Sequence, residues 1–145
     1  MRPFRLISSK FLKVVMLPLL FAACGGDEQC HYEIGATNFV IEPDSAYYFE
    51  INNPGGYIYL SGGHRGVVVV RTGYDQFYAY ERACPLDNGT AVEVTADWGS
   101  SLLECPVCHS QFIVEADGMP TSESAAKCPL FQYSTTYSGG KLYVY

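Results

Sequence analysis

Two cysteine boxes carry the residues of this chain whose types and spacing could do chemistry. The first box, residues 84–87, reads Cys-Pro-Leu-Asp, and the second, residues 105–109, reads Cys-Pro-Val-Cys-His. Thiolates and imidazoles are the ligands that proteins use for zinc and for iron–sulfur clusters. We therefore expect the sulfur atoms of Cys84, Cys105 and Cys108 to converge at the tips of two neighbouring β-loops.

The segments that must position these boxes have the pattern of short strands. Aromatic and β-branched residues dominate them, and Gly, Pro, Asn and Asp separate them. The stretches expected to be strands are 38–42, 46–52, 57–60, 66–71, 76–82, 91–95, 111–115, 131–137 and 141–145. Four consecutive valines, 67–70, predict a strand buried on both faces. The last two stretches are expected to form a hairpin around residues 138–140. The fold class predicted is all-β, an antiparallel sandwich or small barrel.

Residues 67–145 resemble the Rieske iron–sulfur domain. The landmarks that match in order and spacing are Cys84, Cys105, Ser110, Phe112, the Pro-Leu-x-x-Tyr segment at 129–133 and the Gly-Gly hairpin at 138–144. The resemblance implies a Rieske-like fold with two cysteine-bearing loops. It also implies one-electron transfer through a [2Fe–2S] cluster bound by two thiolates and two imidazoles.

The boxes depart from the Rieske ligand pattern at both histidine positions. Leu86 stands at the first position, and a leucine side chain cannot ligate iron. Cys108 stands at the second, and His109 could serve only if the loop bulged by one residue. Leu86 in particular favours loss of the cluster, with the fold kept as a binding or scaffold module without redox activity.

Four interpretations of these cysteines stay open. A [2Fe–2S] cluster with unusual ligands would use Cys84, Cys105, Cys108 and His109. A structural zinc would use the same three thiols with His109 or Cys128 as fourth ligand. Disulfides could instead clamp a clusterless domain, joining Cys84 to Cys105 or Cys108. Finally, Cys105 and Cys108 could form a redox-active pair.

The N-terminus is that of a bacterial lipoprotein. Residues 1–23 have a basic start and an apolar run of ten residues, 14–23, too short to span a bilayer and typical of a signal peptide. The run ends in Leu-Phe-Ala-Ala-Cys, which resembles a lipobox, so Cys24 is expected to carry the lipid. Residues 24–37 then form a tether, which a Cys30–Cys128 disulfide could pin to the β domain, residues 38–145.

Charge limits the partners of the mature chain. Four of the nine Lys and Arg lie in residues 1–23, and all fifteen Asp and Glu follow, which leaves a net charge of −10. Such an acidic chain argues against nucleic acid as a partner. The expected partners are a membrane, through the lipid, and a protein that the sequence does not identify. The location expected is the periplasm or cell surface, with the outer membrane favoured. No catalytic constellation is present in the sequence, so at most an electron-transfer component is expected.

Overall fold

A computed structural model describes residues 30, 32–87, 89–95 and 99–145. The predicted signal peptide and Cys24 lie outside these residues. Within the described part, no helix is both long enough and apolar enough to span a bilayer. The chain folds into three antiparallel sheets, which confirms the all-β class.

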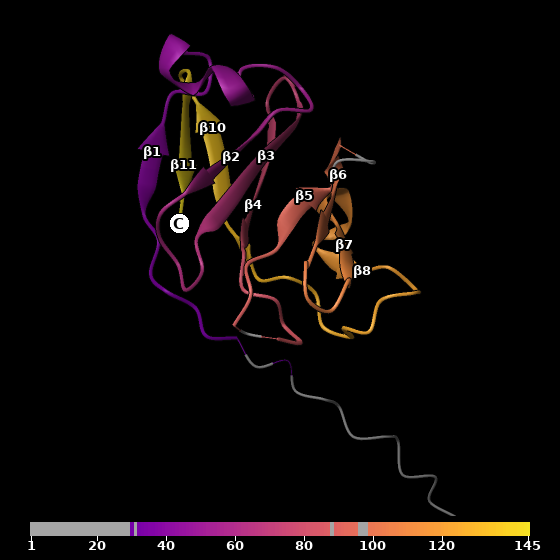
Figure 1. Ribbon diagram of the computed structural model, residues 1–145. Helices are drawn as coiled ribbons and strands as arrows, with labels where there is room; N and C mark the ends of the chain where they lie inside the picture. The colour runs from indigo at the N-terminus through magenta and orange to yellow at the C-terminus, as the bar shows by residue number, and fades with distance from the viewer. Residues whose placement is uncertain (1–29, 31, 88, 96–98) are drawn as a thin grey trace, which may run out of the picture.

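The first two sheets form the larger group of strands in Figure 1. One has the order β1-β11-β10, in which the first strand pairs with the last, and the other has the order β2-β3-β4-β9. Their bounds are β1 Phe39–Ile41, β2 Tyr57–Leu60, β3 Val67–Gly73, β4 Gln76–Glu81, β9 Gln132–Tyr133, β10 Thr135–Ser138 and β11 Lys141–Val144. Gly139 and Gly140 make the turn between β10 and β11 with φ of 58° and 75°, values that favour glycine.

The third sheet stands beside the larger group (Figure 1) and has the order β5-β6-β7-β8. Its strands are β5 Glu93–Thr95, β6 Gly99–Glu104, β7 Gln111–Ile113 and β8 Met119–Pro120. A 3₁₀ helix at Val114–Ala116 follows β7. β5 is an edge strand, as its alternating sequence predicts.

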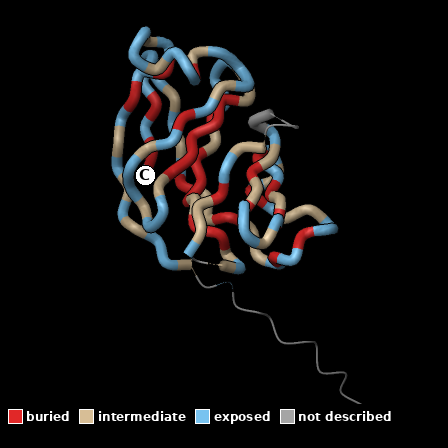
Figure 2. Tube along the Cα trace, in the orientation of Figure 1, coloured by how far each residue is buried: buried red, intermediate tan, exposed pale blue. Residues whose placement is uncertain are grey.

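Strand β3 separates two apolar cores and contributes to both. Val68 and Val70 pack into the core that contains Cys84 and Cys105, whereas Val67 and Val69 pack into the core against Leu142 and Val144. All four valines are fully buried, which confirms the expectation of a strand covered on both faces. Figure 2 shows the buried residues running through the middle of the molecule.

One predicted strand is wrong. Residues 46–52 were expected to be extended, but Ala46–Ile51 form a 3₁₀ helix. Tyr47 and Phe49 are 83% and 67% exposed, and only Ile51 is buried. Of the three aromatic residues only Tyr48 packs against a core, and it is half-buried. The segment therefore lacks the alternating buried face on which the tendency of aromatic residues to form strands depends. The stretch 131–137 is likewise divided between β9 and β10, which belong to different sheets.

Candidate metal centre

The three thiols of the two boxes meet inside the domain. The sulfur atoms of Cys84, Cys105 and Cys108 all lie within 4.8 Å of one another, and those of Cys84 and Cys108 are 3.6 Å apart. All three are free thiols; Cys84 and Cys105 are buried, and Cys108 is half-buried. We call this group the thiol triad.

The first loop follows β4 and places Cys84 in an apolar core. The Cys84 N–H donates to the Thr90 carbonyl over 3.0 Å, and the Thr90 N–H donates back to the Asp87 carbonyl over 3.2 Å. The backbone N–H groups of Leu86 and Asp87 donate to the Cys84 sulfur. The loop therefore closes over its own cysteine and directs two donors at the sulfur.

The second loop joins β6 to β7 as a tight turn. The His109 N–H donates to the Cys105 carbonyl over 2.9 Å, and the Cys105 N–H donates to the Ser110 carbonyl over 3.0 Å. His109 itself has a φ of 56°, in the left-handed region. This turn places Cys105 and Cys108 on one small loop beside Cys84.

Ser110 contacts Cys108, the half-buried member of the triad. Its hydroxyl is fully buried, accepts the Ala126 N–H over 2.9 Å, and lies 3.2 Å from the Cys108 sulfur. As a thiol, Cys108 donates its S–H to the Ser110 oxygen. Once Cys108 ionises, the Ser110 hydroxyl can turn its own hydrogen to the thiolate. Sequence reasoning listed Ser110 as a landmark of the fold and missed this role; the signal available was its position two residues after Cys108.

The surroundings drive two of the thiols in opposite directions. Burial raises the pKa of Cys84 to about 12, although the hydrogen bonds from Asp87 and Leu86 oppose it. Burial also acts to raise the pKa of Cys108, but hydrogen bonds of the Ser110 side chain and backbone, and then of Cys105 and Cys84, together outweigh it and leave that pKa below its ordinary value. Cys108 is thus the thiol poised to lose its proton, whereas Cys84 needs a cation beside it to do so.

The structure does not bring His109 to the triad. Its Nδ1 lies 3.1 Å from Glu104 Oε1, and its side chain is 75% exposed. Hydrogen bonds from Gln111 and then His109 lower the pKa of the Glu104 carboxyl, which keeps it ionised beside the ring. The prediction of His109 as a ligand is therefore corrected: the tight turn directs the chain back into β7, and Glu104 on the paired strand holds the imidazole.

Two other cysteines, Cys30 in the tether and Cys128 in the β domain, are joined to each other. Cys30 and Cys128 form a disulfide, with 5.6 Å between their Cα atoms. The bond consumes Cys128, so its prediction as a fourth zinc ligand is also corrected. No disulfide joins Cys84 to Cys105 or Cys108 in this structure, because all three are free thiols.

The spacing of the triad fits one metal ion. Zinc–sulfur bonds of about 2.3 Å in tetrahedral geometry place two thiolate sulfurs about 3.8 Å apart. The Cys84–Cys108 distance of 3.6 Å is close to that value. Two thiolates bound to one iron of a [2Fe–2S] cluster have a similar spacing. The donor set, all thiolate, suits thiophilic ions such as zinc.

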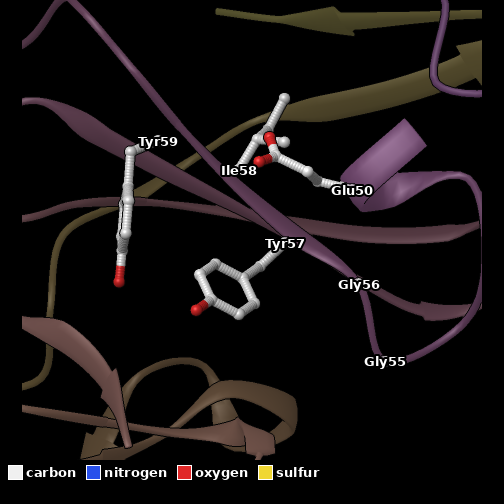
Figure 3. A pocket seen from close by; sticks show the side chains of 6 residues that line it. All are labelled: Glu50, Gly55, Gly56, Tyr57, Ile58 and Tyr59. Atoms are coloured by element: carbon white, nitrogen blue, oxygen red, sulfur yellow. The ribbon is translucent and has the colours of Figure 1, made fainter. Parts of the chain in front are cut away.

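A second hollow lies away from these sulfurs. It has a volume of about 470 Å³ and follows edge strand β2. Figure 3 shows Tyr57 and Tyr59 pointing to one side of β2, with Glu50 and Ile58 on the other. No cysteine lines it. The chemistry that the sequence predicts is therefore confined to the triad among the described residues.

Fold and site together define a small all-β domain with a three-thiol cluster at the tips of two loops. No family model and no curated protein matches the chain. Its fold is similar to a chain of the complex of reduced oxygenase and oxidized ferredoxin in carbazole 1,9a-dioxygenase, with 27% identity, a TM-score of 0.46, and coverage of 63% of this chain and 81% of that one. It is also similar to the ferredoxin of carbazole 1,9a-dioxygenase from Nocardioides aromaticivorans IC177, with 25% identity, a TM-score of 0.46, and coverage of 63% and 86%.

Proposed function

We propose that this chain is a metal-binding protein that holds one thiophilic ion, of the zinc class, on Cys84, Cys105 and Cys108. The observation that carries the proposal is the convergence of three sulfur atoms within 4.8 Å. The first cysteine lies in the loop after β4 and the other two lie in the loop after β6, some twenty positions later in the sequence. The ion would therefore tie these two loops together. Such an ion would hold the two loops together and would bring no redox chemistry of its own.

The residues around the sulfurs support thiolates there. The N–H groups of Leu86 and Asp87 face Cys84, and Ser110 faces Cys108. Hydrogen bonds to metal-bound sulfur orient the ligand and tune its basicity. A metal ion would also supply the positive charge that offsets the burial of the Cys84 thiolate.

Metal analysis of the full chain tests this function. The chain is purified under reducing conditions in detergent, titrated with Zn²⁺ against a chromophoric chelator, and compared with a Cys108→Ser variant. We expect one zinc per chain, and a much weaker affinity in the variant. A chain that takes up no zinc at micromolar concentration would overturn the proposal. So would a coloured protein with two irons and two sulfides per chain.

Electron transfer through a [2Fe–2S] cluster is the second candidate function. The observation that favours it is that the two fully buried thiols, Cys84 and Cys105, come from two separate loops. The backbone N–H of each donates to a carbonyl of its own loop. A coloured protein with two irons and two sulfides per chain, and with a reversible one-electron reduction, would support this function in place of the zinc-class centre.

We further propose that Cys24 carries a lipid and holds the domain at a membrane. The support is the sequence alone: a basic start, a short apolar run and a cysteine after two alanines. Radiolabelled palmitate fed to expressing bacteria should label the protein, and Cys24→Ser should abolish the label. Labelling that persists in Cys24→Ser would contradict this anchor.

A further inference from the structure

We propose that the thiol triad leaves a fourth coordination position open to solvent, where the bound ion takes a neutral nitrogen donor of the imidazole type from outside the chain. This inference rests on the proposed function and deepens it. Zinc sites closed by four protein ligands are structural, whereas sites with three protein ligands keep a position for an exchangeable ligand. The question is therefore whether the chain supplies a fourth donor.

No fourth donor reaches the sulfurs among the residues that the structure describes. The group of His, Cys, Asp and Glu atoms close enough to share an ion consists of the three cysteines. The imidazole of His109 is turned to Glu104, and the sulfur of Cys128 is bonded to Cys30. Leu86, which is two residues after Cys84, has no donor atom in its side chain. The carboxylate of Asp87 accepts the Thr90 hydroxyl. These candidates are thus all committed elsewhere or unable to bind.

The open side of the triad is the side that faces solvent. Cys84 and Cys105 are completely buried, whereas Cys108 is half-buried. The two loops beside the triad present exposed apolar side chains, with Leu86 54% and Val107 64% exposed. The imidazole of His109 is exposed as well and is held by Glu104. An incoming ligand would therefore approach Cys108 across a surface that is apolar except for this pair.

Charge selects the class of ligand. Three thiolates exceed the charge of a divalent ion by one negative charge, and the chain from residue 24 onward carries ten more negative than positive side chains. A second anion at the fourth position would add to this repulsion. A neutral donor adds no charge, and imidazole nitrogen is a ligand that zinc-class ions bind well.

The full chain loaded with one equivalent of Co²⁺ tests the open position, because the ligand-field spectrum of Co²⁺ reports its donors. Imidazole is titrated in, and sodium azide is the anionic comparison. We expect imidazole to shift the visible bands with saturation, and azide to do so only at a much higher concentration. His109→Ala is the matched variant, expected to show the same starting spectrum and the same imidazole response.

The outcomes separate this inference from the proposed function. Failure of Co²⁺ and Zn²⁺ to bind would defeat the metal centre itself. Stoichiometric binding with a spectrum insensitive to imidazole would leave the metal centre standing and overturn the open position. A changed starting spectrum in His109→Ala would also overturn it, since His109 would then be the fourth ligand. An azide response as tight as that of imidazole would overturn the preference for a neutral donor.

Discussion

Cys30 and Cys128 are bonded to each other, whereas Cys84, Cys105 and Cys108 remain thiols although two of their sulfurs are 3.6 Å apart. The bonded pair joins positions separated by 98 residues and has an exposed member, Cys30. The triad lies in an apolar core, with hydrogen-bond donors directed at its sulfurs. One chain therefore uses sulfur in two ways.

The difference teaches that surroundings, and not only the distance between sulfurs, decide what cysteines do. The pair closes a long loop, and a disulfide stabilises by restricting the unfolded chain. The triad has an odd number of sulfurs, so a disulfide within it would always leave one thiol behind. Its donors favour thiolates, the form that binds metals. The two groups should respond differently to the same substitutions.

Removal of one triad sulfur should have the largest effect. We expect Cys84→Ser to weaken Zn²⁺ binding by more than about 100-fold, since loss of a supporting group alone costs about 10–100-fold. Competition with a chromophoric chelator measures the affinity. The matched control is Cys30→Ser with Cys128→Ser, which should keep the affinity within a few-fold. An equal loss in the control would remove the distinction between the two groups of cysteines.

Removal of the bonded pair should instead reduce stability. We expect Cys30→Ser with Cys128→Ser to lower the free energy of unfolding by about 2–5 kcal/mol, because the bond closes a loop of nearly the whole domain. Urea unfolding of the metal-free protein, followed by circular dichroism, gives the value. A midpoint unchanged from that of the parent protein would mean that the bond adds nothing to the fold.

Loss of the Ser110 hydroxyl should act on the triad more mildly. We expect Ser110→Ala to raise the pKa of Cys108, because the side-chain hydrogen bond of Ser110 is the largest contribution that lowers it. Zinc affinity should fall by about 10-fold. The rate of iodoacetamide alkylation against pH, in metal-free protein, locates the pKa. Ser122→Ala, at an exposed position, is the control; a profile that shifts equally in both variants would contradict the role of Ser110.

The smallest effect concerns a link that uses no sulfur. Hydrogen bonds from Tyr137 and then Arg71 lower the pKa of Asp44. A carboxyl with a lowered folded pKa stabilises the fold above its unfolded pKa of about 3.9 and loses that contribution as pH falls through the folded value. Because Asp44 is 52% exposed, we expect less than about 1 kcal/mol. The melting temperature of Asp44→Asn, measured from pH 6 to pH 2, should fall less steeply with decreasing pH than that of the parent protein. An equal fall in both proteins would contradict the role of Asp44.

Sequence patterns predicted the parts of the fold that depend on burial. The valine run 67–70 is apolar and β-branched at every position, a pattern that favours a strand covered on both faces, and the structure has that strand. The segment 46–52 has equally strand-like residues, but Ala46–Ile51 form a 3₁₀ helix and no strand in the described part of the chain pairs with them. Pairing partners are a property of the whole fold and are not written in a local stretch.

The site was predictable to the same extent. The spacing of the boxes indicated that three thiols meet, and they do. It did not show where His109 points. That depends on the left-handed backbone of His109 and on Glu104, which lies opposite Gln111 on the neighbouring strand. Nor did it show the contact of Ser110 with Ala126, which joins residues 16 positions apart.

The pairing of β1 with β11 has a consequence for when the domain can fold. Phe39 lies opposite Val144, and β10 reaches β1 only through β11. Until β11 is synthesised, β1 and β10 have no strand between them to complete the sheet. Such distant contacts are slow to form because the intervening chain must first close its loop. On the ribosome, the sheet that contains β1 therefore stays incomplete for as long as residues 141–144 have not yet been made.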